Sequence, residues 1–169
     1  MPVVEEYFRD YIQFCIKDTL VIFLIVLQCF MQIREITLQE LETVYEVVKQ
    51  LRVDLSYKEF EDLIYDMRHM EYKMIGVFEG ESLITYAGVA IQTNLYHKRH
   101  LFVFDLVTDE KYQSKGYGAM MMEYLHDYAK MGMCENIVLS SGLGRKDAHR
   151  FYEKEGFAKK SYVFVKPLV

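Results

Sequence analysis

A glycine-containing loop at residues 113–118, with the sequence QSKGYG, is the stretch of this chain best suited to bind a ligand. Its two glycines, Gly116 and Gly118, let the backbone approach a bound molecule because no side chain stands in the way. A helical pattern starts directly after the loop, and the first amides of a helix have no internal partner and carry partial positive charge. The loop therefore favours an anionic ligand, above all a phosphate.

The loop differs from two well-known phosphate-binding loops. It has no G-x-x-x-x-G-K-[ST] pattern, and no G-x-G-x-x-G with an acidic residue after a second strand. Its own pattern is Q-x-x-G-x-G, and it follows the residues DLVT at 105–108. A tight turn without a ligand also uses glycine, so the loop alone leaves a binding and a purely structural interpretation open.

A strand before the loop and a helix after it must hold it in place. Residues 101–106 alternate apolar and aromatic side chains of the types that suit a buried strand. After the loop, apolar residues recur at helical spacing from Met120 to Tyr128, and Gly132 is placed to end the helix. The loop is therefore predicted to connect the end of a strand to the start of a helix.

The rest of the chain from Met31 alternates between strands and helices. Two capping boxes, Thr37 with Glu40 and Ser56 with Glu59, predict the starts of two helices. The predicted order is strand 31–36, helices beginning at 37 and 56, strands 73–79 and 83–92 joined by a hairpin, the strand from 101, the helix ending at 132, strand 135–140, helix 147–155 and strand 158–165.

The loop and the strand before it resemble the acetyl-CoA motif of the GNAT superfamily of N-acetyltransferases. In that family Leu-x-Val is followed after a few residues by [Arg/Gln]-x-x-Gly-x-[Gly/Ala]. Leu106 and Thr108 stand where the family has Leu and Val, and Gln113, Gly116 and Gly118 match directly.

A second motif near the end of the chain strengthens this resemblance. Residues 145–157 look like the closing motif Asn-x-x-Ala-x-x-x-Tyr-x-x-x-Gly-Phe, with Ala148, Tyr152 and Gly156 in place. Arg145 replaces Asn, and a guanidinium there can reach a phosphate of CoA. An ordinary core-facing helix has a similar spacing, but two motifs in the correct order are more specific than either one.

The resemblance implies a fold and a domain organisation. The fold is α/β (α+β), a GNAT fold with a mixed central sheet of about six to seven strands flanked by about four helices. The N-acetyltransferase domain covers residues 31–169, and residues 1–30 form an N-terminal apolar extension with an extra helical segment.

The resemblance also implies transfer of an acetyl group from acetyl-CoA to a primary amine of a small molecule or peptide, by direct attack in a ternary complex and without a metal ion. Tyr152 would assist the leaving thiolate, the backbone amide of Leu106 would polarise the thioester carbonyl, and Asp105 is a candidate base. The cofactor-binding residues it implies are Leu106, Val107, Thr108, Gln113, Ser114, Lys115, Gly116, Tyr117, Gly118, Ala119, Arg145 and Tyr152. A CoA-binding sensor or partner-binding module without turnover is the alternative.

The group that accepts the proton of the amine is left open by the sequence. Amines are mostly protonated at pH 7, so a proton must leave before or during attack. Besides Asp105, whose strand face the sequence does not define, the histidines and one tyrosine near the central strand are candidates, as is a chain of water molecules. These further side chains are Tyr96, His97, His100, His126 and His149.

Residues 1–30 allow three interpretations. Residues 3–17 have the spacing of an amphipathic helix, and residues 20–33 are nearly all apolar but shorter than the about 20 residues of a membrane-spanning helix. The segment is an added helix that covers an apolar face or a homodimer contact, an upstream extension of a domain that begins at Met31, or a membrane-surface tether. It lacks the basic start and the cleavage site of a secretory signal.

Composition narrows the class of protein. An apolar fraction of 51% is ample for a core, and a net charge of −5 argues against a nucleic-acid-binding body. The three cysteines have no metal-ligand spacing and are too few for a disulfide framework, so a reducing cytoplasm is the expected location.

Overall fold

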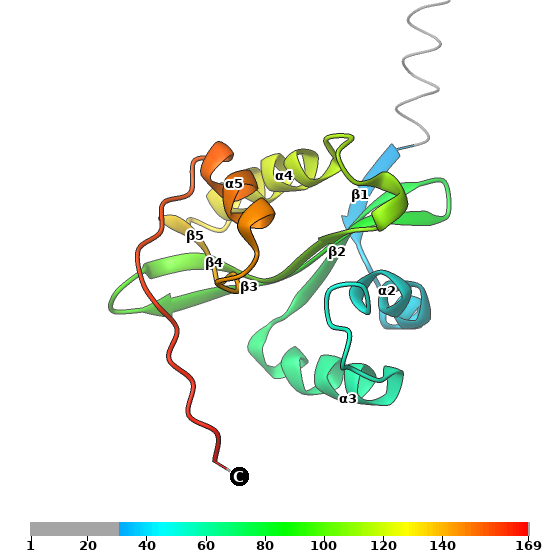
Figure 1. The fold of residues 1–169 in the computed structure, drawn as a ribbon, viewed down its shortest axis with the longest axis horizontal. Helices are drawn as coiled ribbons and strands as arrows, with labels where there is room; N and C mark the ends of the chain where they lie inside the picture. The colour runs from blue at the N-terminus through cyan, green and yellow to red at the C-terminus, as the bar shows by residue number, and fades with distance from the viewer. Residues whose placement is uncertain (1–30, 169) are drawn as a thin grey trace, which may run out of the picture.

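The computed structural model, which describes residues 31–168, has a central sheet with helices on both faces (Figure 1). The five strands are β1 (Met31–Glu35), β2 (Lys73–Glu79), β3 (Ser82–Asn94), β4 (Lys98–Thr108) and β5 (Asn136–Leu139). They lie side by side in chain order; the first four are antiparallel, and β5 runs parallel to β4. The mixed sheet is confirmed. The expected helix and apolar segment of residues 1–30 lie outside the described residues.

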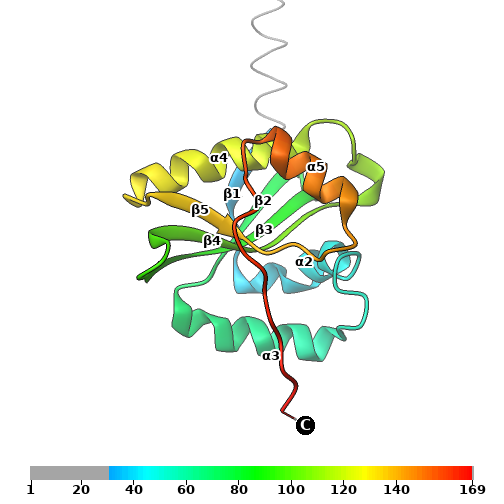
Figure 2. The same cartoon turned by 60° about the vertical axis from the view of Figure 1, so that its left-hand side comes forward.

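Within the described residues, four α-helices cover the two faces of the sheet, as expected. They are α2 (Leu41–Val48), α3 (Tyr57–Met67), α4 (Tyr117–Met131) and α5 (Lys146–Lys154), and three 3-10 turns, η1 (Leu38–Glu40), η2 (Arg68–Met70) and η3 (Glu110–Tyr112), accompany them. Helices α2 and α3 lie on one face of the sheet and α4 and α5 on the other (Figure 2). Within residues 31–168, no helix has the length and apolar character needed to cross a membrane.

Both predicted capping boxes form. The backbone N–H and the hydroxyl of Thr37 each lie 3.0 Å from a carboxylate oxygen of Glu40, at the start of η1 and α2. At α3 the Ser56 N–H donates to Glu59 (3.0 Å), and the Glu59 N–H donates to the Ser56 hydroxyl (3.3 Å). These bonds satisfy amides that a helix leaves without a partner at its first turn.

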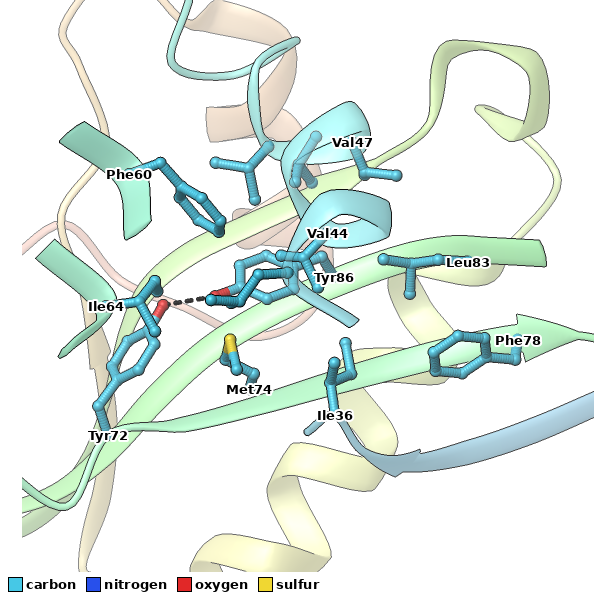
Figure 3. Close-up of a cluster of buried hydrophobic side chains, with 13 residues drawn as sticks. Ile36, Val44, Val47, Phe60, Ile64, Tyr72, Met74, Phe78, Leu83 and Tyr86 are labelled. Carbon is cyan, nitrogen blue, oxygen red and sulfur yellow. Dashed lines mark hydrogen bonds between the residues drawn. The ribbon is translucent and has the colours of Figure 1, made fainter. Parts of the chain in front are cut away.

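Each face of the sheet has its own core. The core under α2 and α3 is shown in Figure 3 and includes Val44, Phe60, Ile64, Tyr72 and Tyr86. The core on the α4 side contains Leu101, Val103 and the buried residues of α4, which are Met121, Met122, Leu125 and Ala129. Met120, part of the predicted apolar pattern, is 37% exposed, so the buried face of α4 is turned by about one residue from the expected one.

The predicted strand at 158–165 is wrong, and within residues 31–168 the sheet has five strands, slightly fewer than the about six to seven expected. This segment has no strand assignment, and its apolar side chains face solvent, with Tyr162 76% and Phe164 93% exposed. A strand needs a neighbouring edge that accepts and donates its backbone hydrogen bonds. The apolar pattern indicates only that the segment suits an extended conformation, and among residues 31–168 it pairs with no edge.

Candidate active site

The central strand β4 is paired unequally on its two sides. It pairs with β3 from Lys98 to Thr108, but with β5 only from His100 to Val103. Within the described residues, the β4 backbone from 104 to 108 therefore has no strand partner on the β5 side. Unpaired backbone groups need other hydrogen-bond partners. This open edge is a place where an extended ligand can pair with main chain, as the splayed strands of the resemblance imply.

The loop 113–118 leads from this open edge into α4. Ser114 and Gly116 have positive φ angles of 61° and 91°, and nothing lies within 4 Å of the place where a Gly116 Cβ would stand. The first hydrogen bond of α4 runs from the Met120 N–H to the Gly116 carbonyl, at 3.0 Å. The N–H groups of residues 117–119 thus have no partner within the helix and face the start of an open loop, an arrangement that suits an anion.

Two side chains of the predicted cofactor-binding set stabilise the loop itself. The Gln113 side-chain amide donates to the Thr108 carbonyl (3.1 Å), which ties the loop to the end of β4. The Thr108 hydroxyl in turn lies 2.9 Å from that of Thr85 on β3. The Lys115 ammonium donates to the Lys111 carbonyl at 3.2 Å. In this structure Gln113 and Lys115 therefore contact the loop and its neighbours.

Helix α5, which carries Tyr152, packs against the start of α4 through Phe151. A Cβ on Gly118 would lie 3.3 Å from Cζ of Phe151, so the two helices touch at a glycine and an aromatic ring. Tyr152 is half-buried beside Phe151 and Phe157, with ring centroids 5.4 and 5.7 Å away. Burial raises the pKa of the Tyr152 hydroxyl, the charge of Arg145 opposes this, and the carboxylate of Asp105 adds to it. Tyr152 is therefore a neutral hydrogen-bond donor at pH 7.

A bulge in β4 decides which way Asp105 points. Gly88 of β3 pairs with Asp105, and the next residue, Val89, pairs with Val103, so Phe104 is an extra residue in the ladder. Side chains alternate along a regular strand, but a bulge places two successive residues on one face. Phe104 packs against the core under α2 and α3, and Asp105 lines a cavity on that same face.

This cavity has a volume of about 510 Å³ and lies between the sheet, α3 and the connection from α2 to α3. Two buried tyrosines lie within it, Tyr72 and Tyr86, whose hydroxyls are 2.6 Å apart (Figure 3). Burial raises the pKa of both phenols above the ordinary value, so both are neutral at pH 7. Its lining residues are Val48, Leu51, Arg52, Val53, Asp54, Leu55, Phe60, Leu63, Ile64, Met67, Tyr72, Tyr86, Asp105 and Arg145.

The charged groups of the cavity are partly paired. Both contacts of the Arg52 guanidinium with Asp105 go to one carboxylate oxygen, Oδ1, at 2.8 and 2.6 Å. Arg52 also donates to the Phe104 carbonyl (3.3 Å). Arg145 donates to the Leu51 carbonyl (3.2 Å), so its guanidinium reaches the α2–α3 connection. Asp105 therefore uses only one of its two carboxylate oxygens in these contacts.

The candidate histidines do not gather at this point. His100 is buried with Nδ1 2.9 Å from the Lys98 carbonyl, and five residues of strand, about 16 Å at 3.3 Å per residue, separate it from Asp105. Tyr96 and His97 lie beyond it in the β3–β4 turn, and His126 is exposed on α4. Among residues 31–168, no group of three His, Cys, Asp or Glu side chains is placed to hold a metal ion.

Sequence reasoning missed the residues that line the cavity opposite Asp105. Tyr72 directly precedes β2, Tyr86 lies on β3 and Arg52 lies in the α2–α3 connection, and no short motif contains them. A sequence signal exists only at Gly88, a glycine inside a strand, which often marks a close approach. The Tyr72 hydroxyl lies over this glycine, 1.7 Å from where its Cβ would be.

Comparison with known proteins agrees with this geometry. The profile of the acetyltransferase (GNAT) family matches residues 33–157. An uncharacterised N-acetyltransferase of Bacillus subtilis, YhdJ, is 35% identical over 126 residues, which cover 73% of this chain and 89% of the relative. The aminoalkylphosphonate N-acetyltransferase of Salmonella typhimurium is 24% identical over 143 residues, covering 81% and 91%.

A solved structure shows the same fold. An aminoglycoside N-acetyltransferase in complex with CoA superposes with a TM-score of 0.70, covering 82% of this chain and 95% of its own, at 12% identity. This identity supports the fold alone, whereas the family profile and the Bacillus subtilis relative cover most of the chain. The chain therefore belongs to the acetyltransferase (GNAT) family, as the two sequence motifs predicted.

Proposed function

We propose that this protein transfers the acetyl group of acetyl-CoA to a primary amine by direct attack in a ternary complex. The observation that carries the proposal is the open edge of β4 at residues 104–108, continuous with the loop 113–118 and the free amides of α4. Family membership supports acetyl transfer, and the relatives that carry a descriptive name are N-acetyltransferases.

The residues of the open edge and the loop fit acetyl-CoA. Backbone groups of Leu106, Val107 and Thr108 have no strand partner on the β5 side and would pair with the pantetheine arm. The amides of Ser114, Lys115, Gly116, Tyr117, Gly118 and Ala119 would hold the pyrophosphate, because the left-handed backbone at Ser114 and Gly116 and the helix start leave donors free. The Gln113 N–H would join them only after it leaves the Glu110 carbonyl, to which it donates at 3.5 Å. When bound, acetyl-CoA supplies an acetyl group activated as a thioester.

Two groups would act on the reacting atoms. The Leu106 amide would donate to the carbonyl oxygen of the thioester, which gains charge as the amine attacks, and a donor of this kind is worth about 3 kcal/mol. The Tyr152 hydroxyl would donate to the departing sulfur. Because the pKa of Tyr152 is raised, the hydroxyl keeps its proton until that sulfur becomes a stronger acceptor.

Two further side chains have supporting roles in the proposal. Asp105 would accept a proton from the amine, either directly or through water, since its Oδ2 has no hydrogen-bond partner among the described residues. Arg145 lies at the start of α5. Its guanidinium donates to the Leu51 carbonyl, and in this position it lines the cavity. An arginine at this position would contact a CoA phosphate only after it leaves the Leu51 carbonyl.

The experiment is a two-step measurement on the full chain. Calorimetric titration tests whether acetyl-CoA binds, and the release of free CoA thiol tests whether an amine accepts the acetyl group. Direct attack predicts intersecting initial-rate lines when both substrates are varied, whereas a covalent acetyl-enzyme gives parallel lines. Binding without thiol release for any amine would instead identify a CoA-binding module.

A further inference from the structure

The cavity beside Asp105 has both polar and apolar lining. Its polar groups, called here the polar end, are the Asp105 carboxylate and the hydrogen-bonded hydroxyls of Tyr72 and Tyr86. Two apolar side chains, Phe60 and Ile64, project from α3 toward these hydroxyls, as Figure 3 shows. Further lining residues of the same kind are Val48, Leu51, Leu55, Leu63 and Met67. A molecule that fills this space must therefore be polar at one tip and apolar along its body.

The polar end has capacity for one nitrogen. Arg52 contacts only Oδ1 of Asp105, so Oδ2 is free to accept a hydrogen bond from an amine. In the phenol pair one hydroxyl donates its proton to the oxygen of the other. The accepting hydroxyl has a proton of its own, and this proton has no acceptor among residues 31–168. Both tyrosines are more than nine-tenths buried. A buried donor without an acceptor is costly, and a ligand atom with a lone pair would satisfy it.

The charges around the cavity disfavour a polycation. Two arginines, Arg52 and Arg145, line it together with two aspartates, Asp54 and Asp105. Asp105 is already paired with Arg52, so Asp54 is the one lining carboxylate without an ion pair among residues 31–168. A ligand with several ammonium groups would find no cluster of carboxylates here and would also meet two guanidinium groups. Both arginines also donate hydrogen bonds within the protein, which leaves them less available to bind an anionic tail.

From these observations we infer that the acceptor is a small monoamine with an apolar body, such as an arylalkylamine or alkylamine. This inference rests on the proposed function. The amine lies between Asp105 Oδ2 and the Tyr72–Tyr86 pair, and the body packs against Phe60, Leu63 and Ile64 of α3. In the reaction the amine lone pair leaves the phenol O–H and forms the C–N bond, the C–S bond breaks, and the amine proton passes toward Asp105. The departing thiolate takes a proton from the Tyr152 hydroxyl, which regains one from solvent, so CoA leaves as the thiol.

The test compares amines on the unmodified protein. Rates of thiol release from acetyl-CoA are measured with phenethylamine and hexylamine, and with spermidine, an aminoglycoside and 2-aminoethylphosphonate. We expect kcat/KM for the two apolar monoamines to exceed that for each of the others by at least about tenfold, the discrimination available from one to two apolar contacts. A preference for the polyamine, the aminoglycoside or the phosphonate, or turnover of none of the five, overturns the inference.

Two substitutions on one helix locate the apolar wall. Leu63 and Tyr65 are 48% and 47% exposed on α3, but only Leu63 lines the cavity. Leu63→Asn is expected to lower kcat/KM for phenethylamine about tenfold, with acetyl-CoA affinity unchanged, because it places a polar amide against the apolar body. Tyr65→Asn is the matched control and should leave kcat/KM within about twofold.

The outcomes separate the inference from the proposed function. If acetyl-CoA does not bind in the calorimeter, the proposed function fails. If acetyl-CoA binds and Leu63→Asn behaves like Tyr65→Asn, the position of the acceptor body is wrong while the proposed function stands.

Discussion

Gly88→Ala is the substitution with the clearest expected effect, because it adds one methyl group directly against Tyr72, which lines the cavity. A Cβ on Gly88 would lie 1.7 Å from Oη of Tyr72 and 2.4 Å from its Cζ, distances at which the ring cannot stay. Tyr72 is packed against Phe104, with ring centroids 5.4 Å apart, and its hydroxyl is bonded to Tyr86. Moving the ring therefore disturbs a buried packing contact and a buried hydrogen bond together.

The expected loss of stability combines three effects. Overpacking a core costs about 1–3 kcal/mol and an unsatisfied buried hydroxyl about 1–3 kcal/mol, while replacing glycine in a strand returns about 0.5–1 kcal/mol. The free energy of unfolding should fall by about 3 kcal/mol, which for a chain of this size lowers Tm by about 6–12 °C. Urea unfolding followed by circular dichroism measures the first quantity and a thermal scan the second.

Two controls make the prediction specific. Gly144 has no atom within 4 Å of its Cβ position, so Gly144→Ala should change the free energy of unfolding by less than about 0.5 kcal/mol. In a Tyr72→Leu background the colliding atoms are gone, and Gly88→Ala should become neutral or stabilising by up to about 1 kcal/mol. Gly88→Ala with wild-type stability in the native background would refute the contact between Gly88 and Tyr72.

The other predictions concern the cofactor site, an ion pair and the N-terminal extension. Tyr152→Phe keeps the ring but removes the hydroxyl, so steady-state kinetics should show kcat lower by about 10²–10⁴ with acetyl-CoA affinity unchanged; a fall within about threefold would make Tyr152 a packing residue only. Gly118→Val should weaken acetyl-CoA binding about tenfold in calorimetry, which is about 1.4 kcal/mol. The reason is that a branched side chain enters the crowded contact with Phe151, where even a Cβ would lie 3.3 Å from the ring. Equal affinity would remove this loop from the proposed site. The hydrogen bonds from the Arg34 guanidinium, with those from Thr37, lower the pKa of Glu40 from its ordinary 4.5 to about 2, so its contribution to stability is present above pH 4.5 and lost as the pH falls toward 2. Glu40→Gln should reduce the change in the free energy of unfolding between pH 4.5 and pH 2 by roughly 1 kcal/mol, after allowance for solvent screening of a partly exposed pair. An unchanged pH dependence of this free energy would contradict the stabilising role of Glu40. A chain that starts at Met31 should retain acetyl-CoA binding, and a folded but non-binding truncation would place the extension within the active domain.

Local features were readable from the sequence because each depends on residues close together in the chain. The capping boxes at Thr37 and Ser56 need only a side chain and an amide three residues apart, and both form as predicted. The turn at Gly116 needs a positive φ that glycine adopts readily, and the loop and its helix follow from it. The two motifs identified the family, which the profile match confirms.

Features that depend on pairing between distant segments were decided only by the tertiary structure. The strand pattern at 158–165 describes a segment suited to extension, but the sequence does not say whether it pairs with a sheet edge, and among the described residues it pairs with none. Likewise β4 is mainly apolar from Leu101 to Val107, yet β5 meets it only as far as Val103 and leaves the next five residues, 104–108, open on that side.

The direction of Asp105 shows the difference most clearly. Simple alternation along β4 would place Asp105 opposite Phe104, and the sequence left its face undefined. The extra residue at Phe104 exists only in the register with β3, where Gly88 and Val89 oppose Asp105 and Val103, and it turns the carboxylate toward Arg52, Tyr72 and the cavity. The sequence by itself determined the loop, the helix starts and the family. The cavity beside Asp105 required the fold, because register is a property of two strands and is not written in either one.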